Sequence, residues 1–375
     1  MERCFVSASA ELFRKFSIES NKRATGELEL TIRSWLRYLR SWKNELGSDG
    51  SWRERRRAWP LGFRVATYRL LELDRRDHTL YVPDFPLSRP ATRMNGFWNP
   101  IIGNKLVLSY VAQAAGVPCP ALLGALVHGR PYSFDGTPAD DLTAALEQWT
   151  QTARRMVFRP HWSGAAEGVF FVDRESGQWR INDQPASITE LTTLLRALHR
   201  YLVTEWVEQA TFARRIYPRT PNTLRVLMLR DADGPFVAAA VHRFGSSRSF
   251  PVDNFHAGRG GLGAPVDIAT GRLGAALGAD ANGRMTPFTH HPETNERIDG
   301  VDIPHYHAAI DGMRRLCHAL PEGVWVGWDA LMTDDGYRIL EGNSPPGLHV
   351  WQVHEPLLRD ARVARFFAAH GVGTS

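Results

Sequence analysis

The chain has 375 residues, of which 43% are apolar and 23% are charged, and its formal net charge is +5. This composition is ordinary for a soluble globular protein, and the length is enough for two or three domain-sized units. No run of eighteen apolar residues is present, so we expect no membrane span. The first sixteen residues are charged and lack a long apolar core, which argues against a secretory signal. Three widely spaced cysteines argue against a disulfide framework, and we expect a cytoplasmic protein.

The N-terminal part combines a helical pattern with positive charge. Apolar residues at helical spacings predict helix within residues 1–60, interrupted at 47–50 by Gly-Ser-Asp-Gly. Residues 33–75 hold eleven of the basic side chains. They form either a binding face for an anionic partner, such as a phosphorylated substrate, RNA or a membrane surface, or a solvated helical face. Interspersed acidic residues, and no evident aromatic stacking platform, favour the solvated face and argue against nucleic acid.

The pattern becomes regular after Asn104. Residues 105–115 have the spacing of an amphipathic helix, which Gly116 ends, and residues 121–127 predict a short apolar strand. Small residues at 164–168 indicate a loop. Other elements alternate as far as residue 207, with helices expected over 138–153 and 188–200 and strands over 155–158, 169–172 and 202–207.

The second half is rich in β-formers. Strands are expected over 224–229, 236–241, 325–332 and 337–340, and one long helix over 305–319. Asp334-Asp335-Gly336 is typical of a hairpin turn between the last two strands. The fold class predicted is α+β with antiparallel sheets, not a regular βαβ array.

The predicted hairpin carries a candidate metal site. Pairing of its two strands would bring Asp329 beside Glu341, and Glu341 and Asn343 are two residues apart, so they share a strand face. Two carboxylates and an amide oxygen are hard ligands that suit Mg²⁺, which also retains water and phosphate ligands. Divalent ions at this point could bridge the phosphates of ATP and neutralise their charge.

These residues also carry a family resemblance. Asp329, followed by Glu341-x-Asn343-x-x-Pro346-Gly347, resembles the end of the ATP-grasp core, as in D-alanine–D-alanine ligase, where the Asp, Glu and Asn hold magnesium ions. The wider set of motifs, from about residue 100 to 355, most resembles the sugar-transfer-associated ATP-grasp group. That set includes Asn222, Asp253, Gly260, His291, Gly300, Pro304 and Trp328.

The resemblance implies an ATP-grasp fold in which two α/β subdomains with antiparallel sheets clamp ATP. On this interpretation residues 96–205 form the small subdomain and N-terminal lobe, and residues 206–375 form the C-terminal subdomain with the metal site. Residues 1–95 lie outside the specific motifs and are expected to be a helical, basic segment on the substrate side.

The resemblance also assigns the nucleotide-binding residues. Lys105 would contact ATP, and Glu205 would accept from the adenine amino group. Arg159 stands where the family usually has lysine, so the positive charge is kept on a planar fork in place of a point ammonium. The other expected contacts are Ser163 and Gly164 in a loop over the triphosphate, the Val207 backbone at the base, and Glu208 at the ribose.

The remaining motif residues suggest the reaction. Arg225, Arg243 and Asn254 would act beside the γ-phosphate and an acyl-phosphate, which fits ligation of a small-molecule carboxylate, free or carrier- or phosphate-linked, to an amine. Positioning and cationic stabilisation would dominate such catalysis. ATP and Mg²⁺ (two ions, with Mn²⁺ as an alternative) are the expected cofactors. Two alternatives stay open: a kinase of a hydroxyl or sugar substrate, and a non-catalytic partner-binding member. The oligomeric state is not predicted.

Overall fold

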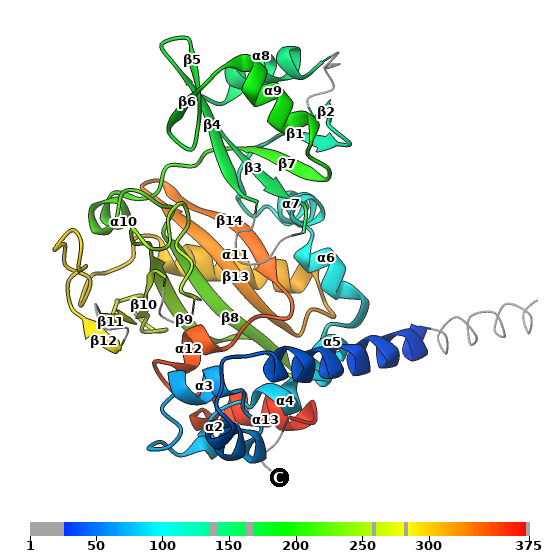
Figure 1. The fold of residues 1–375 in the computed structure, drawn as a ribbon, viewed down its shortest axis with the longest axis vertical. Helices are drawn as coiled ribbons and strands as arrows, with labels where there is room; N and C mark the ends of the chain where they lie inside the picture. Colours follow the sequence, from blue (N-terminus) through cyan, green and yellow to red (C-terminus); the bar gives the residue numbers. More distant parts are fainter. Residues whose placement is uncertain (1–25, 135–140, 163–167, 257–259, 281–283, 373–375) are drawn as a thin grey trace, which may run out of the picture. The chain divides into compact units, whose positions relative to one another are not determined.

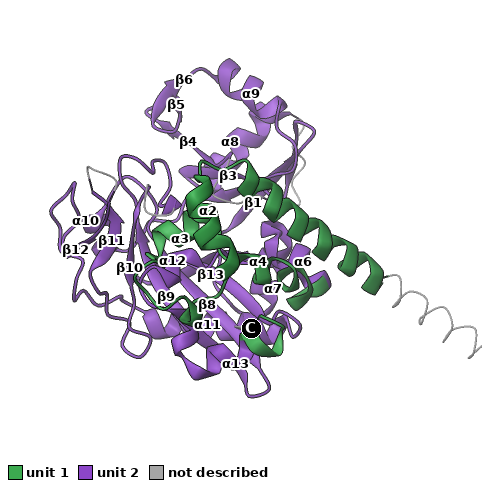
Figure 2. Ribbon diagram, turned by 60° about the horizontal axis from the view of Figure 1, so that its bottom comes forward, with its two compact units in different colours: residues 1–96, 367–375 green, residues 97–366 purple. Residues whose placement is uncertain are grey.

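The computed structural model describes residues 26–134, 141–162, 168–256, 260–280 and 284–372. The chain divides into two compact units, one formed by residues 1–96 with 367–375 and the other by residues 97–366 (Figure 2). Among the helices of the described part, none combines the length and the apolar character that crossing a membrane requires.

The first unit is helical in its described residues. A helix over residues 26–46 is followed by a turn, as the glycines at 47 and 50 predict. Trp42 stacks flat on Phe85, with ring centroids 3.9 Å apart. The buried Glu45 carboxylate accepts hydrogen bonds from the Trp59 indole and the Val65 backbone, which ties the long helix to the short ones. The short helices are α2 (Trp52–Ala58), η1 (Trp59–Leu61), α3 (Val65–Leu70), η2 (His78–Leu80), α4 (Asp84–Ser88) and α5 (Pro90–Met94).

The described residues of the second unit form two antiparallel sheets of seven strands each (Figure 1). The first sheet has the strand order β2-β1-β7-β3-β4-β5-β6, and every pair in it is antiparallel. Helices α8 (Leu142–Thr152) and α9 (Ile188–Arg196) pack on this sheet and bury an apolar core. Its strands are β1 (Leu122–Val127), β2 (Arg130–Ser133), β3 (Arg155–Pro160), β4 (Phe170–Glu175), β5 (Gln178–Ile181), β6 (Gln184–Ala186) and β7 (Tyr201–Glu205).

The second sheet has the order β12-β11-β10-β9-β8-β13-β14. Strand β13 is buried along its whole length, which explains its nearly continuous apolar sequence. Helix α11 (Tyr306–Ala319) packs against β9, β13 and β14. The strands are β8 (Thr223–Asp231), β9 (Gly234–Phe244), β10 (Leu262–Pro265), β11 (Ala276–Ala279), β12 (Met285–Phe288), β13 (Trp325–Thr333) and β14 (Gly336–Asn343).

Short helices connect the sheets and close the chain. Helix α7 (Lys105–Ala114) begins at Asn104, whose side chain accepts hydrogen bonds from the backbone N–H groups of Leu106 and Val107. This cap fixes the first turn of the helix. Both α6 and α7 contact β14. The other helices of this region are η3 (Gly96–Trp98), α6 (Asn99–Gly103), α10 (Thr211–Ile216), α12 (His349–Gln352), η5 (Leu357–Arg359) and α13 (Ala361–Ala369).

The hairpin of β13 and β14 forms as the sequence predicts, with Asp329 opposite Glu341 and Gly327 opposite Asn343. A β-bulge follows Asp329, because Ala330 pairs with Ile339 and leaves Leu340 as an extra residue. The bulge increases the local twist and changes the direction of the strand next to the carboxylates. The long elements expected from sequence are present with ends shifted by a few residues, whereas β2, β5, β6 and β10–β12 were not predicted.

Candidate functional site

The carboxylates of Asp329 and Glu341 and the amide of Asn343 come together on one face of the β13–β14 hairpin. The Asn343 Nδ2 lies 3.4 Å from both Asp329 Oδ2 and Glu341 Oε1, and it donates to the Gly327 carbonyl at 3.2 Å. Asp329 is only 2% exposed. The convergence expected from strand periodicity is therefore present in the structure.

Two arginines from the neighbouring strands neutralise Asp329. Arg225 on β8 faces Asp329 in the strand register and donates from Nη1 to both of its carboxylate oxygens, at 3.1 and 2.9 Å. Arg243 on β9 donates from Nη2 to Asp329 at 3.1 Å and lies 3.4 Å from Asp253. Burial raises the pKa of the Asp329 carboxyl, and both guanidinium groups oppose that effect. Adjacent strands of one sheet thus supply both cations.

Thr223 and Asp253 hold Arg243 in place. The Thr223 hydroxyl accepts hydrogen bonds from Arg243 Nε at 3.0 Å and from Nη2 at 2.6 Å, and it donates its own proton to Asp253. The Thr223 backbone N–H also donates to Asp253, at 2.9 Å. The guanidinium fork is consequently fixed in orientation by a buried network as well as by charge.

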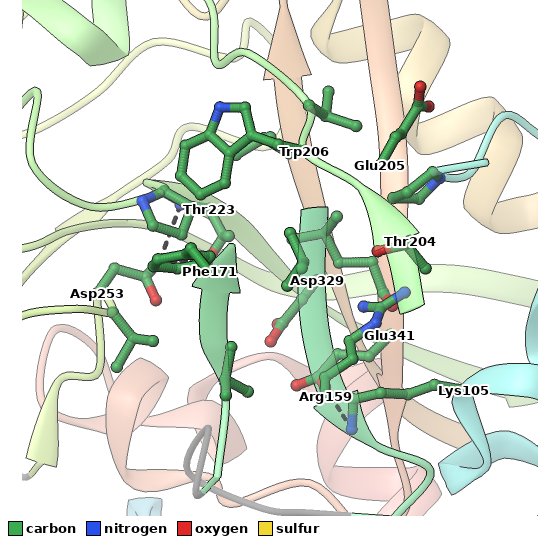
Figure 3. Close-up of a pocket in the computed structure, with 18 of the residues that line it drawn as sticks. Lys105, Arg159, Phe171, Thr204, Glu205, Trp206, Thr223, Asp253, Asp329 and Glu341 are labelled. Carbon is green, nitrogen blue, oxygen red and sulfur yellow. Dashed lines mark hydrogen bonds and ion pairs between the residues drawn. The ribbon is translucent and has the colours of Figure 1, made fainter. Parts of the chain in front are cut away.

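Lys105 and Arg159 bring two more cations to the hairpin. Lys105 Nζ lies 3.1 Å from Glu341 Oε2 and the lysine is 5% exposed (Figure 3). Burial alone would raise the pKa of Glu341, but Lys105, with Arg225 and Arg159, holds it below its ordinary value. Arg159 reaches from β3 of the first sheet to the second, where its Nη1 donates to the Leu340 carbonyl at 3.0 Å.

A pocket lies between the two sheets, with the charged cluster at one side (Figure 3). Phe171 and Trp206 form part of its wall and pack edge to face, with centroids 4.8 Å apart. The Arg155 guanidinium lies over the Trp206 ring, 4.4 Å from its centroid. The other apolar lining residues are Pro120, Val157, Val169, Val207, Pro221, Val252, Leu331 and Leu340. An apolar slot beside a cationic cluster suits a ligand with a flat ring at one end and anionic groups at the other.

A second pocket adjoins the first. Arg243, Asp253 and Glu341 line both pockets, so the charged cluster forms the boundary between them. The second pocket has a more polar lining than the first, and it also contains Arg225, Asn254, Phe255, Asn343 and His349.

His349 begins helix α12 and stacks on Phe255, with ring centroids 6.4 Å apart. Burial, aided by the charge of Arg225, lowers the pKa of His349 to about 4. A neutral imidazole therefore faces a pocket that also holds two guanidinium groups.

Of the residues predicted to bind the adenosine part of ATP, some line the first pocket and others do not. Val207 lines the first pocket, but Glu208 does not and instead accepts from the Trp206 indole at 2.9 Å. Glu205 lines the pocket and accepts at Oε1 from the Ala121 backbone N–H at 2.9 Å, a partner that the sequence did not indicate. Ser163 and Gly164 lie outside the described residues.

Several residues around the site were not assigned a role from the sequence. Thr223 and His349 are among them, as are the ring pair of Phe171 and Trp206. Aromatic residues in strands usually indicate core packing, so these positions gave no distinguishing signal. Asn254 was predicted as catalytic, and it lies in the second pocket, away from the apolar slot.

The donor set at the hairpin fits a magnesium ion. No group of three His, Cys, Asp or Glu side chains is placed to hold a metal within the described ranges, so the set depends on the Asn343 amide together with Asp329 and Glu341. Rotation of that amide by half a turn would present Oδ1 to the carboxylates. Mg²⁺ commonly takes one or two carboxylates and completes its shell with water and substrate phosphates.

Comparisons with solved structures find ATP-grasp proteins at low identity. One is the ATP-grasp ligase PsnB complexed with minimal precursor (14% identity, TM-score 0.36, covering 68% of this chain and 56% of that one). Another is the L-amino acid ligase from Bacillus licheniformis (10% identity, TM-score 0.38, covering 72% of this chain and 48% of that one). A third is the D-alanine–D-alanine ligase from Bacillus anthracis (10% identity, TM-score 0.37, covering 71% of this chain and 69% of that one). The chain spans about half the length of the first of these structures. No curated protein matches it.

A protein-family model also matches the chain. The match covers most of the second unit, including the hairpin, the arginines and both pockets. It agrees with the expected α+β fold with two antiparallel sheets. The family described as sugar-transfer associated ATP-grasp matches residues 94–363, which is more than half of the sequence, and the chain belongs to this family.

Proposed function

We propose that the protein is an ATP-dependent, magnesium-requiring ligase that joins a carboxylate to an amine through an acyl-phosphate. The observation that carries the proposal is the shared boundary of the two pockets, where Arg243 and Glu341 line both. An apolar slot on one side suits the adenine ring, and a polar pocket on the other suits a small acid. The γ-phosphate of ATP would then lie at the boundary, beside the cations.

In the nucleotide pocket, the adenine ring would lie between Phe171 of the first sheet and Leu340 of the second, and Lys105 and Arg159 would bind the phosphates. Asp329, Glu341 and Asn343 would hold Mg²⁺, which supplies charge neutralisation for the phosphates when it is bound. Within the family core, residues 96–205 would form the small subdomain and N-terminal lobe, and residues 206–375 would form the C-terminal subdomain with the metal site.

In the first step, an oxygen of the substrate carboxylate attacks the γ-phosphorus, and the bond to the bridging oxygen breaks. ADP leaves and a mixed carboxylic–phosphoric anhydride forms. Negative charge is spread over the transferring phosphoryl oxygens at this stage. Arg225 and Arg243 are the groups that would stabilise it, and because Thr223 already fixes the Arg243 fork, little reorganisation is required.

In the second step, the amine attacks the acyl carbon, the C–O bond to phosphate breaks, and inorganic phosphate leaves. The nitrogen must lose a proton in this step. His349 is the residue we propose as the acceptor, because its imidazole lies in the second pocket. The negative charge of an acyl-phosphate bound there would raise the pKa of His349 toward the range that a general base requires. Asn254 would orient the acyl-phosphate there. The carboxylate and the amine are small molecules or are carried on a phosphorylated or carrier-linked partner.

The test is a matrix of carboxylates and amines incubated with purified protein, ATP and Mg²⁺. ADP and inorganic phosphate are measured separately, and products are identified by mass. Equal release of ADP and phosphate, dependent on both substrates, supports the ligase. ADP without phosphate, with a substrate heavier by one phosphoryl group, would assign a kinase instead. Asp329→Asn should abolish either activity, whereas Asp311→Asn, on the exposed face of α11, should have no effect.

A further inference from the structure

An apolar stripe is exposed along the helix over residues 26–46 of the first unit. At 100° per residue, its six members fall within a sector about 100° wide and extend for about 27 Å along the axis. Five of them are at least half exposed, including Leu36 at 57% and Leu39 at 58%. The buried positions Leu30, Ser34 and Ser41 lie elsewhere on the helix circumference. The stripe consists of Leu28, Ile32, Trp35, Leu36, Leu39 and Leu46.

Positive charge runs beside this stripe. Lys43 lies within the sector of the stripe, and Arg40, Arg33 and Arg37 follow around the flank beside it. On this flank Arg33 is paired with Glu29 at 2.6 Å. Residues 26–96 contain 14 basic and nine acidic side chains, a surplus of five that equals the formal net charge of the whole chain. Several of these cations form no hydrogen bond or ion pair with any described residue. They are Arg40, Lys43, Arg53, Arg56 and Arg57.

A second copy of the chain packed antiparallel along this helix is a poor occupant of the stripe. An antiparallel pair that aligns Leu28 with Leu46 would bring Arg33 of one helix close to Arg40 of the other. That arrangement puts like charges together on the flank of an apolar seam, which costs free energy. The charges therefore favour an anionic occupant.

We propose that the stripe inserts into the surface of an anionic membrane, with the helix lying in the interface plane. An apolar ridge with leucine and tryptophan, bordered by lysine and arginine, is the pattern of an interfacial helix. The adjoining α2 adds the exposed Trp52 and a run of arginines at 55–57. Arg89 lies over the Trp35 ring at 4.2 Å, so a cation sits at the edge of the stripe and can reach lipid phosphates.

The proposal is independent of the ligase reaction and is tested with full-length protein and lipid vesicles. Flotation is measured with phosphatidylcholine alone and with phosphatidylcholine mixed with phosphatidylglycerol. Partitioning should be at least about tenfold stronger on the anionic vesicles and should weaken as salt is raised. The double variant Leu36→Gln/Leu39→Gln should lose about tenfold or more. Arg40→Glu/Lys43→Glu should lose the preference for anionic lipid.

The matched controls are exposed residues of the second unit. Ile268→Gln and Arg196→Glu remove an apolar side chain and a cation elsewhere, and both should bind vesicles like the unaltered protein. Thermal unfolding checks every variant. If the leucine variant is destabilised, the charge variant, which changes only exposed side chains, decides between the two outcomes.

Three results would overturn the proposal. The first is no flotation of the unaltered protein with anionic vesicles at low salt. The second is flotation that neither double variant changes. The third is a concentration-dependent dimer in light scattering, lost in Leu36→Gln/Leu39→Gln and without vesicle binding, which would assign the stripe to a second copy.

Discussion

Replacing Arg243 with lysine keeps the positive charge at the pocket boundary but removes the planar fork. In the structure that fork makes two hydrogen bonds to Thr223 Oγ1, at 3.0 and 2.6 Å, and also reaches Asp329 at 3.1 Å. A single ammonium can keep one carboxylate contact, but it cannot also hold Thr223 in the same geometry. We therefore expect the loss of two charge-assisted hydrogen bonds, at about 1.5 kcal/mol each.

Their sum, about 3 kcal/mol, corresponds to a fall in kcat of about 100-fold if the fork is needed in the transition state. The KM for ATP should change by less than about threefold, because a charge remains to attract the phosphates. ADP release is followed by a coupled assay at temperatures well below the unfolding midpoint of the variant.

Arg272→Lys is the matched control. Arg272 makes a similar two-armed contact with Asp302, at 2.8 and 3.1 Å, but both side chains are solvent-exposed. Its kcat should be unchanged. An Arg243→Lys enzyme that keeps kcat within about threefold of the original would refute the idea that this guanidinium acts on the transferring phosphoryl group.

Three other changes have defined outcomes. Asn343→Ala should raise the Mg²⁺ concentration needed for half-maximal activity about tenfold or more, and an unchanged Mg²⁺ titration would contradict its role as a ligand. His349→Gln should form less amide per ADP released, because the acyl-phosphate hydrolyses before the amine is deprotonated; a ratio that stays at one would exclude His349 as the base. Burial lowers the pKa of His242 to about 3, below the 6.5 of an unfolded histidine. Only the unfolded chain gains this proton as the pH falls, so stability is complete above about pH 6.5 and decreases by about 1.4 kcal/mol per pH unit toward pH 3. Urea unfolding of His242→Asn at several pH values should show a shallower decline, and an identical slope would contradict this account.

Local patterns were enough to predict the hairpin of the site. The turn residues at 334–336 and the β-formers on both sides fix which strands pair, and the two-residue spacing of Glu341 and Asn343 fixes the face they share. These are short-range constraints that a sequence carries directly. The same holds for Lys105, whose place in the first helical turn follows from the Asn104 cap.

The contacts that depend on distant parts of the chain could not be predicted in this way. Glu205 pairs with the Ala121 backbone 84 residues away, and nothing in either segment indicates the other. The sequence around His349 does not distinguish it from other histidines in short helices, because its contact with Phe255 joins segments that are far apart in the chain. The strands β11 and β12, at one end of the second sheet, have only four residues each, which is too few for an alternating pattern to appear.

Arg159 of the first sheet donates a hydrogen bond to the Leu340 carbonyl of the second. This contact between the sheets is insensitive to substitution at position 340. Its acceptor is a backbone atom at the β-bulge, and substitution at position 340 leaves that atom in place as long as the bulge is kept. The Leu340 side chain meanwhile lines the apolar slot. Related sequences can therefore vary this residue to reshape the slot for another ring while the bridge from Arg159 is inherited unchanged.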